Sequence, residues 1–236
     1  FDRTEWTERV RRLSQLFLKY PNFTSSEVTF TADPMTRYMV NSEGSKIVEQ
    51  HFSYLVSIKA SALAKDGMQL SLADSVNVVD PSLLPDEAAL SKKVEKLAVS
   101  LKQLCPAPVA EPHVGPAILS GRAAAVFFHE TFGHRVEAVH QKNENEGKTF
   151  SRRIGSNVMP SFLTVIDDPT SAKFGSEYLN GHYFYDDEGV AAQPVTIAKK
   201  GVLTSFLLSR TLVRGFKASN GHGRCSPGWN PEARQA

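Results

Sequence analysis

The stretch YMVNSEGSKIVEQHFSYLVSI, residues 38–58, predicts the fold of the first half of the chain. Apolar, β-branched and aromatic residues lie on both sides of NSEG at 41–44, a pattern typical of two strands joined by a turn. Asn and Gly tolerate the left-handed backbone that such a turn needs. The β pattern extends over residues 27–79, so we expect an antiparallel sheet there.

Apolar side chains at spacings of three and four residues predict a helix on either side of this sheet. The first covers residues 3–19 and ends before Pro21, and the second runs from Asp86 to Leu104. The fold class expected for the chain is therefore α+β. Residues 1–112 are assigned to an amino-terminal domain that combines these helices with the sheet.

A proline-rich connector leads into a second domain, residues 113–236. A short buried strand at 116–120 and a helix at 122–140 that carries the sequence HExxxH are expected to open it. The start of a β-rich carboxy-terminal domain follows, with strands predicted at 162–166, 183–185, 194–198 and 202–208. The chain begins without Met and stops after a glycine-rich stretch, so we expect an excerpt truncated at its carboxyl end rather than a chain that has lost a leader.

Composition excludes several classes of protein. The 236 residues are 41% hydrophobic and 22% charged, which is typical of a folded globular chain. A net charge of +2 without a basic run argues against direct nucleic-acid binding, and no apolar stretch is long enough for a membrane span. Two cysteines are too few for a disulfide scaffold, so we expect a cytoplasmic protein, with a mature periplasmic enzyme as the open alternative.

The motif HExxxH, formed by His129, Glu130 and His134, carries the most chemical information. In a regular α-helix, residues five apart are separated by about 140° around the axis, too far for two imidazoles to bind one ion. The spacing suits a metal only where the helix is broken, and Gly133 is expected to permit this. The alternative is an unbroken helix on which Glu130, His134 and Glu137 form a solvated polar stripe.

With such a break, the motif predicts a zinc site. His129 and His134 would bind the ion as neutral imidazoles, and Glu130 would act as the general base that takes a proton from the activated water. Zinc lowers the pKa of bound water to about 7, so hydroxide becomes available at neutral pH.

Other residues of the second domain have two interpretations each. Cys225 is either a further thiolate ligand or an ordinary loop cysteine, and Glu137 is a weaker candidate ligand. His222 and Arg224 are candidates for binding a peptide substrate, because the neighbouring glycines leave room for another chain, although a structural loop explains them too.

Three further features favour structural roles. Cys105, at a predicted helix end, is expected to be structural. The acidic runs at 186–189 and 167–170 contain turn-forming residues, so hairpin turns are a simpler interpretation than a carboxylate site.

Ordered motifs give the chain a resemblance to a known family. They are GRAAA at 121–125 before HExxxH, EGKTF at 146–150, VIDDPT at 165–170, YDDEGV at 185–190 and SNGHGR at 219–224. Together with the hairpin at 41–44, they resemble the TldD/PmbA family of metallopeptidases, also called modulators of DNA gyrase. The resemblance covers most of the chain from Glu27 onward.

The resemblance implies a zinc-dependent peptidase that acts on unfolded or extended peptides inside a chamber formed by two subunits, either identical or related. His129 and His134 match the family's histidine ligands, and Glu130 matches its catalytic glutamate. The family's third ligand is a cysteine late in the carboxy-terminal domain. We expect that ligand to lie outside this chain, and zinc to be weakly held or absent without it.

Two other functions compete with the peptidase. A non-catalytic partner subunit of the same family would share the fold but lack the metal motif, so the presence of His129, Glu130 and His134 argues against it. A DNA-binding regulator of gyrase is disfavoured by the near-neutral charge.

Overall fold

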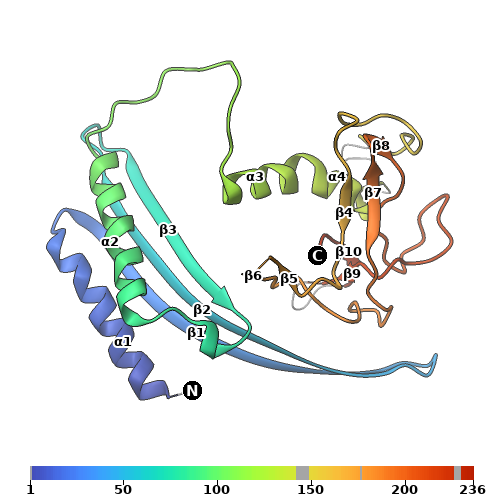
Figure 1. Ribbon diagram of the computed structural model, residues 1–236, viewed down its shortest axis with the longest axis horizontal. Helices are drawn as coiled ribbons and strands as arrows, with labels where there is room; N and C mark the ends of the chain where they lie inside the picture. Colours follow the sequence, from blue (N-terminus) through green and yellow to red (C-terminus); the bar gives the residue numbers. More distant parts are fainter. Residues whose placement is uncertain (1, 142–148, 176, 226–229) are drawn as a thin grey trace. The chain divides into compact units, whose positions relative to one another are not determined.

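The computed structural model describes residues 2–141, 149–175, 177–225 and 230–236 (Figure 1). The chain forms two compact units. One covers the residues up to Tyr38 together with Val48–Val114, and the other covers Met39–Ile47 together with Gly115–Ala236. The predicted α+β class is confirmed. The division into domains at residues 112 and 113 stays a prediction.

The first unit packs two helices against a three-stranded sheet of order β1-β2-β3. Its elements are α1 (Arg3–Gln15), the 3₁₀ turn η1 (Leu16–Lys19), β1 (Phe23–Val40), β2 (Lys46–Leu63), β3 (Gln69–Val78), the 3₁₀ turn η2 (Pro81–Leu83) and α2 (Glu87–Leu104). Alternate residues of β2, from Val56 to Ala62, are buried together with Leu13 of α1 and Leu90 of α2. This core confirms the predicted helices and sheet.

The predicted turn between β1 and β2 is built by Asn41. Its side-chain oxygen accepts the backbone N–H groups of Glu43, at 3.1 Å, and Ser45, at 2.9 Å. Gly44 has a φ of +89°, the left-handed conformation that the sequence predicted. The turn belongs to the second unit, where Glu43 pairs with Arg210.

The second unit joins a short, irregular helix to small sheets. Its helical segments are α3 (Gly121–Phe128), the π-helical η3 (His129–Gly133), α4 (His134–Val136) and the 3₁₀ turn η4 (Ala138–Gln141). A three-stranded sheet contains β4 (Val165–Asp167), β7 (Val195–Lys199) and β8 (Val202–Leu203). Two further sheets have two strands each: β5 (Lys173–Phe174) pairs with β6 (Glu177–Tyr178), and β9 (Gly223–Arg224) pairs with β10 (Glu232–Ala233). A core that includes Phe132, Val136, Ile197 and Leu203 connects the helix to the β4-β7-β8 sheet.

Several predicted elements of this unit are wrong. Residues 116–120 form no strand, and Ile118 is fully exposed, because no neighbouring strand among the described residues pairs with this segment. Residues 183–185 contain only one bridge, from Tyr185 to Ala191. The strand predicted at 202–208 is limited to β8, and the helix predicted at 122–140 is interrupted at residue 129.

The chain after β8 leaves the sheet to contact the end of the helix instead. Leu207 N–H donates to the carbonyl of Val136 at 2.8 Å, and Ala138 N–H donates to the carbonyl of Leu207 at 3.0 Å. Glu137 therefore lies at an isolated parallel bridge with Leu207, which fixes its backbone. Among the described parts of the chain, no helix is long and apolar enough to cross a bilayer.

Gly201→Ala is expected to destabilise the protein by about 3 kcal/mol, because backbone strain and overpacking act together. Gly201 has a φ of +83°, and a Cβ there would lie 2.4 Å from the carbonyl oxygen of Met159. Gly215→Ala is the matched control, since Gly215 has a φ of +92° but no atom within 4 Å of the added Cβ. Urea unfolding measures both. Equal losses of stability would show that the contact with Met159 contributes nothing.

Candidate metal centre

The helix that carries HExxxH changes its winding within the motif. Residues 129–133 form a π-helical turn between α3 and α4, and His134 N–H donates to the carbonyl of His129, five residues earlier. A π turn is wider than an α turn, so residues five apart lie on nearly the same face. This confirms the prediction that the chain around Gly133 is not a regular α-helix.

The sequence suggested that Gly133 permits a break in the helix, but Gly133 itself is helical. Its φ of −55° and ψ of −56° are helical values that other residues adopt as well. Instead, Gln235 packs against it, and a Cβ on Gly133 would lie 1.8 Å from the Gln235 Oε1 atom. The glycine therefore permits the close approach of a distant segment.

The wide turn brings His129, Glu130 and His134 together. The two imidazole centroids are 4.4 Å apart. The Nε2 atom of His129 lies 3.9 Å from Glu130 Oε1, and the Nε2 atom of His134 lies 4.0 Å from Glu130 Oε2. One ligand atom from each residue lies within 4.8 Å of the others, and all three side chains are reachable from solvent. Two imidazoles and a carboxylate suit zinc, so the residues present fit a metal ion.

Glu137 lies behind His134 and is almost completely buried. Its Oε2 atom is 3.0 Å from His134 Nδ1 and 3.2 Å from His140 Nε2. His134, Glu137 and His140 thus form a second group of metal-compatible side chains. The sequence motifs gave no role to His140 and indicated Glu137 only as a ligand or as part of an exposed stripe. The available signal was that Glu137 lies three residues from His134 and three residues from His140, a spacing that brings side chains together on a helix.

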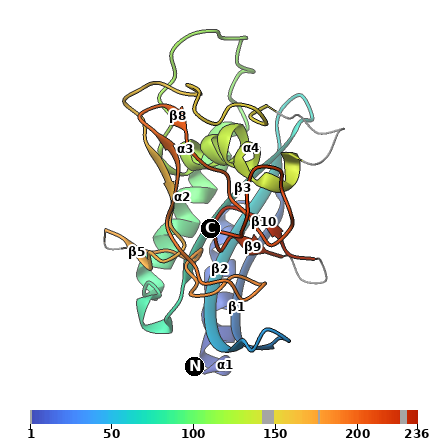
Figure 2. The ribbon, with the colours of Figure 1, turned by 90° about the vertical axis from the view of Figure 1, so that its right-hand side faces the viewer.

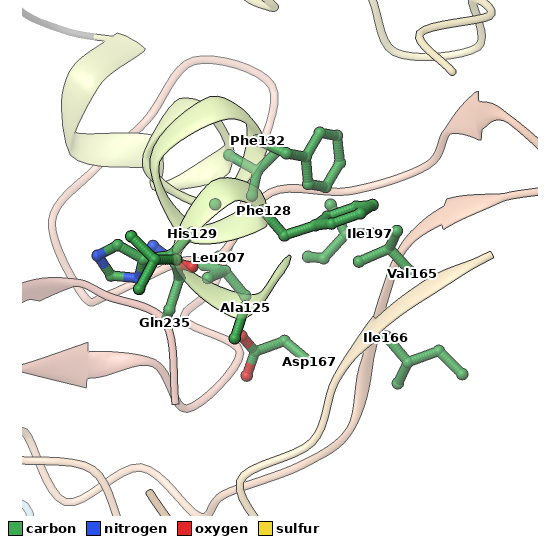
Figure 3. Close-up of a pocket in the computed structure, with 13 residues that line it drawn as sticks. Ala125, Phe128, His129, Phe132, Val165, Ile166, Asp167, Ile197, Leu207 and Gln235 are labelled. Atoms are coloured by element: carbon green, nitrogen blue, oxygen red, sulfur yellow. The ribbon is translucent and has the colours of Figure 1, made fainter. Parts of the chain in front are cut away.

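Two cavities meet at this helix. One, of about 450 Å³, is lined by His129, His134, Glu137, Gly181, Tyr183, Arg224, Cys225, Arg234, Gln235 and Ala236. Another, of about 550 Å³, is mostly apolar (Figure 3). Figure 3 shows Phe128 and Phe132 on one side of it and Val165 and Ile197 nearby, with Asp167 towards Gln235. His129 borders both cavities.

The carboxyl-terminal residues contribute to the first cavity. Figures 1 and 2 both place the end of the chain beside β9 and β10. Gln235 N–H donates to Glu137 Oε1 at 3.2 Å, and Arg234 Nη1 lies 3.7 Å from Glu137 Oε2.

Cys225 and Arg224 border the cavity of the candidate metal centre. Cys225 is exposed, and its backbone N–H donates to Asp187 at 2.8 Å. It belongs to none of the metal-compatible groups found among the described residues. Arg224 pairs with Asp187 and stacks 4.2 Å over the ring of Tyr183.

His222 is enclosed by the protein. Its Nε2 atom lies 3.1 Å from Asp167 Oδ1, and its Nδ1 atom lies 3.0 Å from the carbonyl of Asn220. In this position the imidazole has no exposed surface for a peptide. Tyr183 supports the same loop by donating its hydroxyl to the carbonyl of Gly221 at 2.7 Å, and burial raises the pKa of that hydroxyl.

The predicted acidic turns are confirmed. Buried Asp186 accepts backbone N–H groups from Glu188, Val190 and Gly223, and burial raises its pKa. Asp168 accepts the N–H of Thr170 at 3.0 Å. These carboxylates organise loops.

The two remaining features lie elsewhere in the chain. The Cys105 thiol donates to the carbonyl of Leu101 at the end of α2, as expected for a structural cysteine. Of the motif EGKTF, Glu146, Gly147 and Lys148 lie outside the described residues, whereas Thr149 accepts a hydrogen bond from Arg135.

The chain is similar to named metalloproteases. It is 28% identical over 218 residues to a metalloprotease of Methanothermobacter thermautotrophicus, covering 90% of this chain and 45% of that protein. It is 33% identical over 96 residues to a zinc metalloprotease TldD homolog of Saccharolobus solfataricus, covering 40% of this chain and 20% of that protein. The chain thus spans less than half the length of these curated relatives.

A solved structure shares the fold. TldE from Thermococcus kodakarensis superposes with a TM-score of 0.69 at 18% identity, covering 97% of this chain and 49% of that one. Residues 112–236, more than half of the chain, match the family model described as the PmbA/TldA metallopeptidase C-terminal domain. The π turn with its paired histidines thus lies within the matched region, and the chain belongs to the PmbA/TldA metallopeptidase family.

Proposed function

We propose that the protein is a zinc-dependent peptidase that hydrolyses peptide bonds in unfolded or extended peptides. The observation that carries the proposal is the convergence of His129, Glu130 and His134, whose ligand atoms lie within 4.8 Å of one another. The zinc metalloprotease TldD homolog among the relatives supports zinc as the metal. The adjoining apolar cavity offers space for an apolar side chain of an extended peptide.

The two histidines and Glu130 are proposed to have different roles in the reaction. His129 and His134 would hold the ion through their Nε2 atoms, which both face Glu130. A bound zinc ion supplies Lewis-acid chemistry, polarising the peptide carbonyl and acidifying water. Glu130 accepts the proton of the attacking water and returns it to the leaving amine. Its exposed carboxylate is accessible to both reactants.

A catalytic zinc site normally has three protein ligands. The two histidines therefore need another, and Cys225 is a candidate because it borders the same cavity. The proposed third ligand, in preference to Cys225, is the cysteine that the family resemblance implies, outside this sequence. Arg224, on the wall of the same cavity, is proposed to contact the peptide. The same role for His222 requires the loop to open, because its side chain is buried.

The 236-residue chain by itself is expected to bind zinc weakly or not at all, because two imidazoles are one ligand short. Equilibrium dialysis against a chelator measures this for the parent and for Cys225→Ser. Stoichiometric zinc retained by both variants would contradict the expectation. Retention lost only in Cys225→Ser would identify Cys225 as the missing ligand.

The full-length protein provides the test of function. Elemental analysis is expected to find zinc, and an unfolded peptide is expected to be cleaved in a chelator-sensitive way. A folded protein without zinc and without hydrolysis would favour the non-catalytic partner subunit. Cleavage that persists in the fully metal-free protein would remove the metal from the mechanism.

We further propose that the subunit pairs with an identical or related subunit and acts in the cytoplasm. The similarity to a structure named TldE supports a related partner. Light scattering of the purified protein, alone and with such a partner, distinguishes the two assemblies.

A further inference from the structure

We infer that Glu137 is a positioning residue that fixes the ring of His134 so that its Nε2 atom faces the candidate metal site. This inference rests on the proposed metal site of His129, Glu130 and His134. The two carboxylates approach different atoms of the His134 ring: Glu137 lies next to Nδ1, whereas Glu130 lies near Nε2.

The contacts of the two ring nitrogens of His134 determine their roles. Nδ1 lies 3.0 Å from Glu137 Oε2, a hydrogen-bond distance. A carboxylate only accepts, so the proton of a neutral imidazole is held on Nδ1. The lone pair is then on Nε2, which is the atom that faces Glu130. Outer carboxylates act on metal-binding histidines in this way, fixing both the tautomer and the ring orientation.

The surroundings of Glu137 hold its carboxylate in one position. Its side chain is 1% exposed, so the charge and the hydrogen-bonding capacity of the carboxylate have to be compensated by other protein groups. His140 Nε2 lies 3.2 Å from Oε2, Gln235 N–H donates to Oε1 at 3.2 Å, and Arg234 Nη1 lies 3.7 Å from Oε2. His140 belongs to η4, and Arg234 and Gln235 follow β10, so the carboxylate is anchored by two separate segments of the chain.

The backbone of Glu137 is anchored as well. The bonds between Leu207 and the residues on either side of Glu137 fix the chain at the helix exit. The helical conformation ends here, with a φ of −73° and a ψ of 114° at Glu137. The carboxylate therefore cannot follow His134 if that ring rotates, and it holds the ring in place.

A second ion held by His134, Glu137 and His140 is the competing interpretation. It would require the His134 Nδ1 atom to lose its proton and give up the hydrogen bond to Glu137. The 3.0 Å contact and the buried carboxylate favour the hydrogen bond over an intervening ion.

The test uses Glu137→Gln in the full-length protein. The apparent zinc affinity, measured by chelator competition, is expected to fall about 10- to 100-fold. The ¹⁵N chemical shifts of the His134 ring are expected to show a mixture of tautomers in place of the Nδ1–H tautomer alone. Glu232→Gln is the matched control, because Glu232 pairs with Arg234 at 2.8 Å but is only partly buried, with 42% of its side chain exposed, and belongs to no metal-compatible group among the described residues. Its zinc affinity should stay within about twofold of the parent.

A conservative variant keeps the test decisive if Glu137→Gln fails to fold. Glu137→Asp keeps the charge but shortens the side chain, and it should bind zinc less tightly than the parent but keep the Nδ1–H tautomer. The inference would be overturned if either folded variant bound zinc with the affinity of the parent and kept His134 in the Nδ1–H tautomer. A stoichiometry of two ions per chain that falls to one in His140→Gln would overturn it in favour of the second site. If the parent protein binds no zinc, the proposed function fails, and this result is distinguishable from failure of the inference about Glu137.

Discussion

Glu130→Gln in the full-length protein is expected to lower the rate of peptide hydrolysis by about 10²- to 10⁴-fold while fold and metal content stay unchanged. The amide has nearly the same shape as the carboxylate but cannot accept a proton from water. Glu130 is the group suited to this step because its oxygens lie about equally far from the two Nε2 atoms, at 3.9 and 4.0 Å.

Single-turnover cleavage of an extended peptide, together with elemental analysis, measures this effect. Glu177→Gln is the control, because Glu177 is also an exposed glutamate of the second unit and lines neither cavity. Turnover within a few-fold of the parent would exclude Glu130 as the general base. Loss of zinc together with activity would instead indicate that Glu130 binds the metal.

His129→Ala in the full-length protein is expected to lower zinc affinity by about 10³-fold, since a site with few ligands loses a large share of its binding free energy with each one. Hydrolysis should disappear with the metal and should not return at ordinary zinc concentrations. The His129 side chain is half-exposed, so its truncation should have little effect on the free energy of unfolding.

Chelator competition and urea unfolding check the two parts of this prediction. His182→Ala is the matched control, because His182 packs edge-to-face with Phe184 and belongs to no metal-compatible group among the described residues. Retention of zinc by His129→Ala at the parental affinity would mean that the π turn does not present a metal site.

Local patterns in the sequence predicted the parts of the fold that depend on interactions between residues close together in the chain. The hairpin around Asn41 and the helix ending at Leu104 follow from turn chemistry and apolar spacing. The angular mismatch between His129 and His134 also predicted a change in the helix, since five-residue spacing and an α-helix are incompatible.

Features that depend on distant segments were not predictable in this way. Gly133 looked like a helix breaker, but its absence of a side chain makes room for Gln235, about a hundred residues later in the chain. Leu207 lies in a strand-like run, yet its backbone pairs with the helix exit. Glu137 appeared able to face solvent, and only the packing around it shows that it is buried.

The π turn also bears on how such a site tolerates insertions and deletions. A π turn accommodates one more residue than an α turn while the flanking helical segments stay in phase. Removing one residue between Glu130 and Gly133 would thus shorten the spacing to HExxH, which brings two histidines together on a regular helix. The two motif lengths are then alternative backbone solutions to the same ligand arrangement, separated by a single codon.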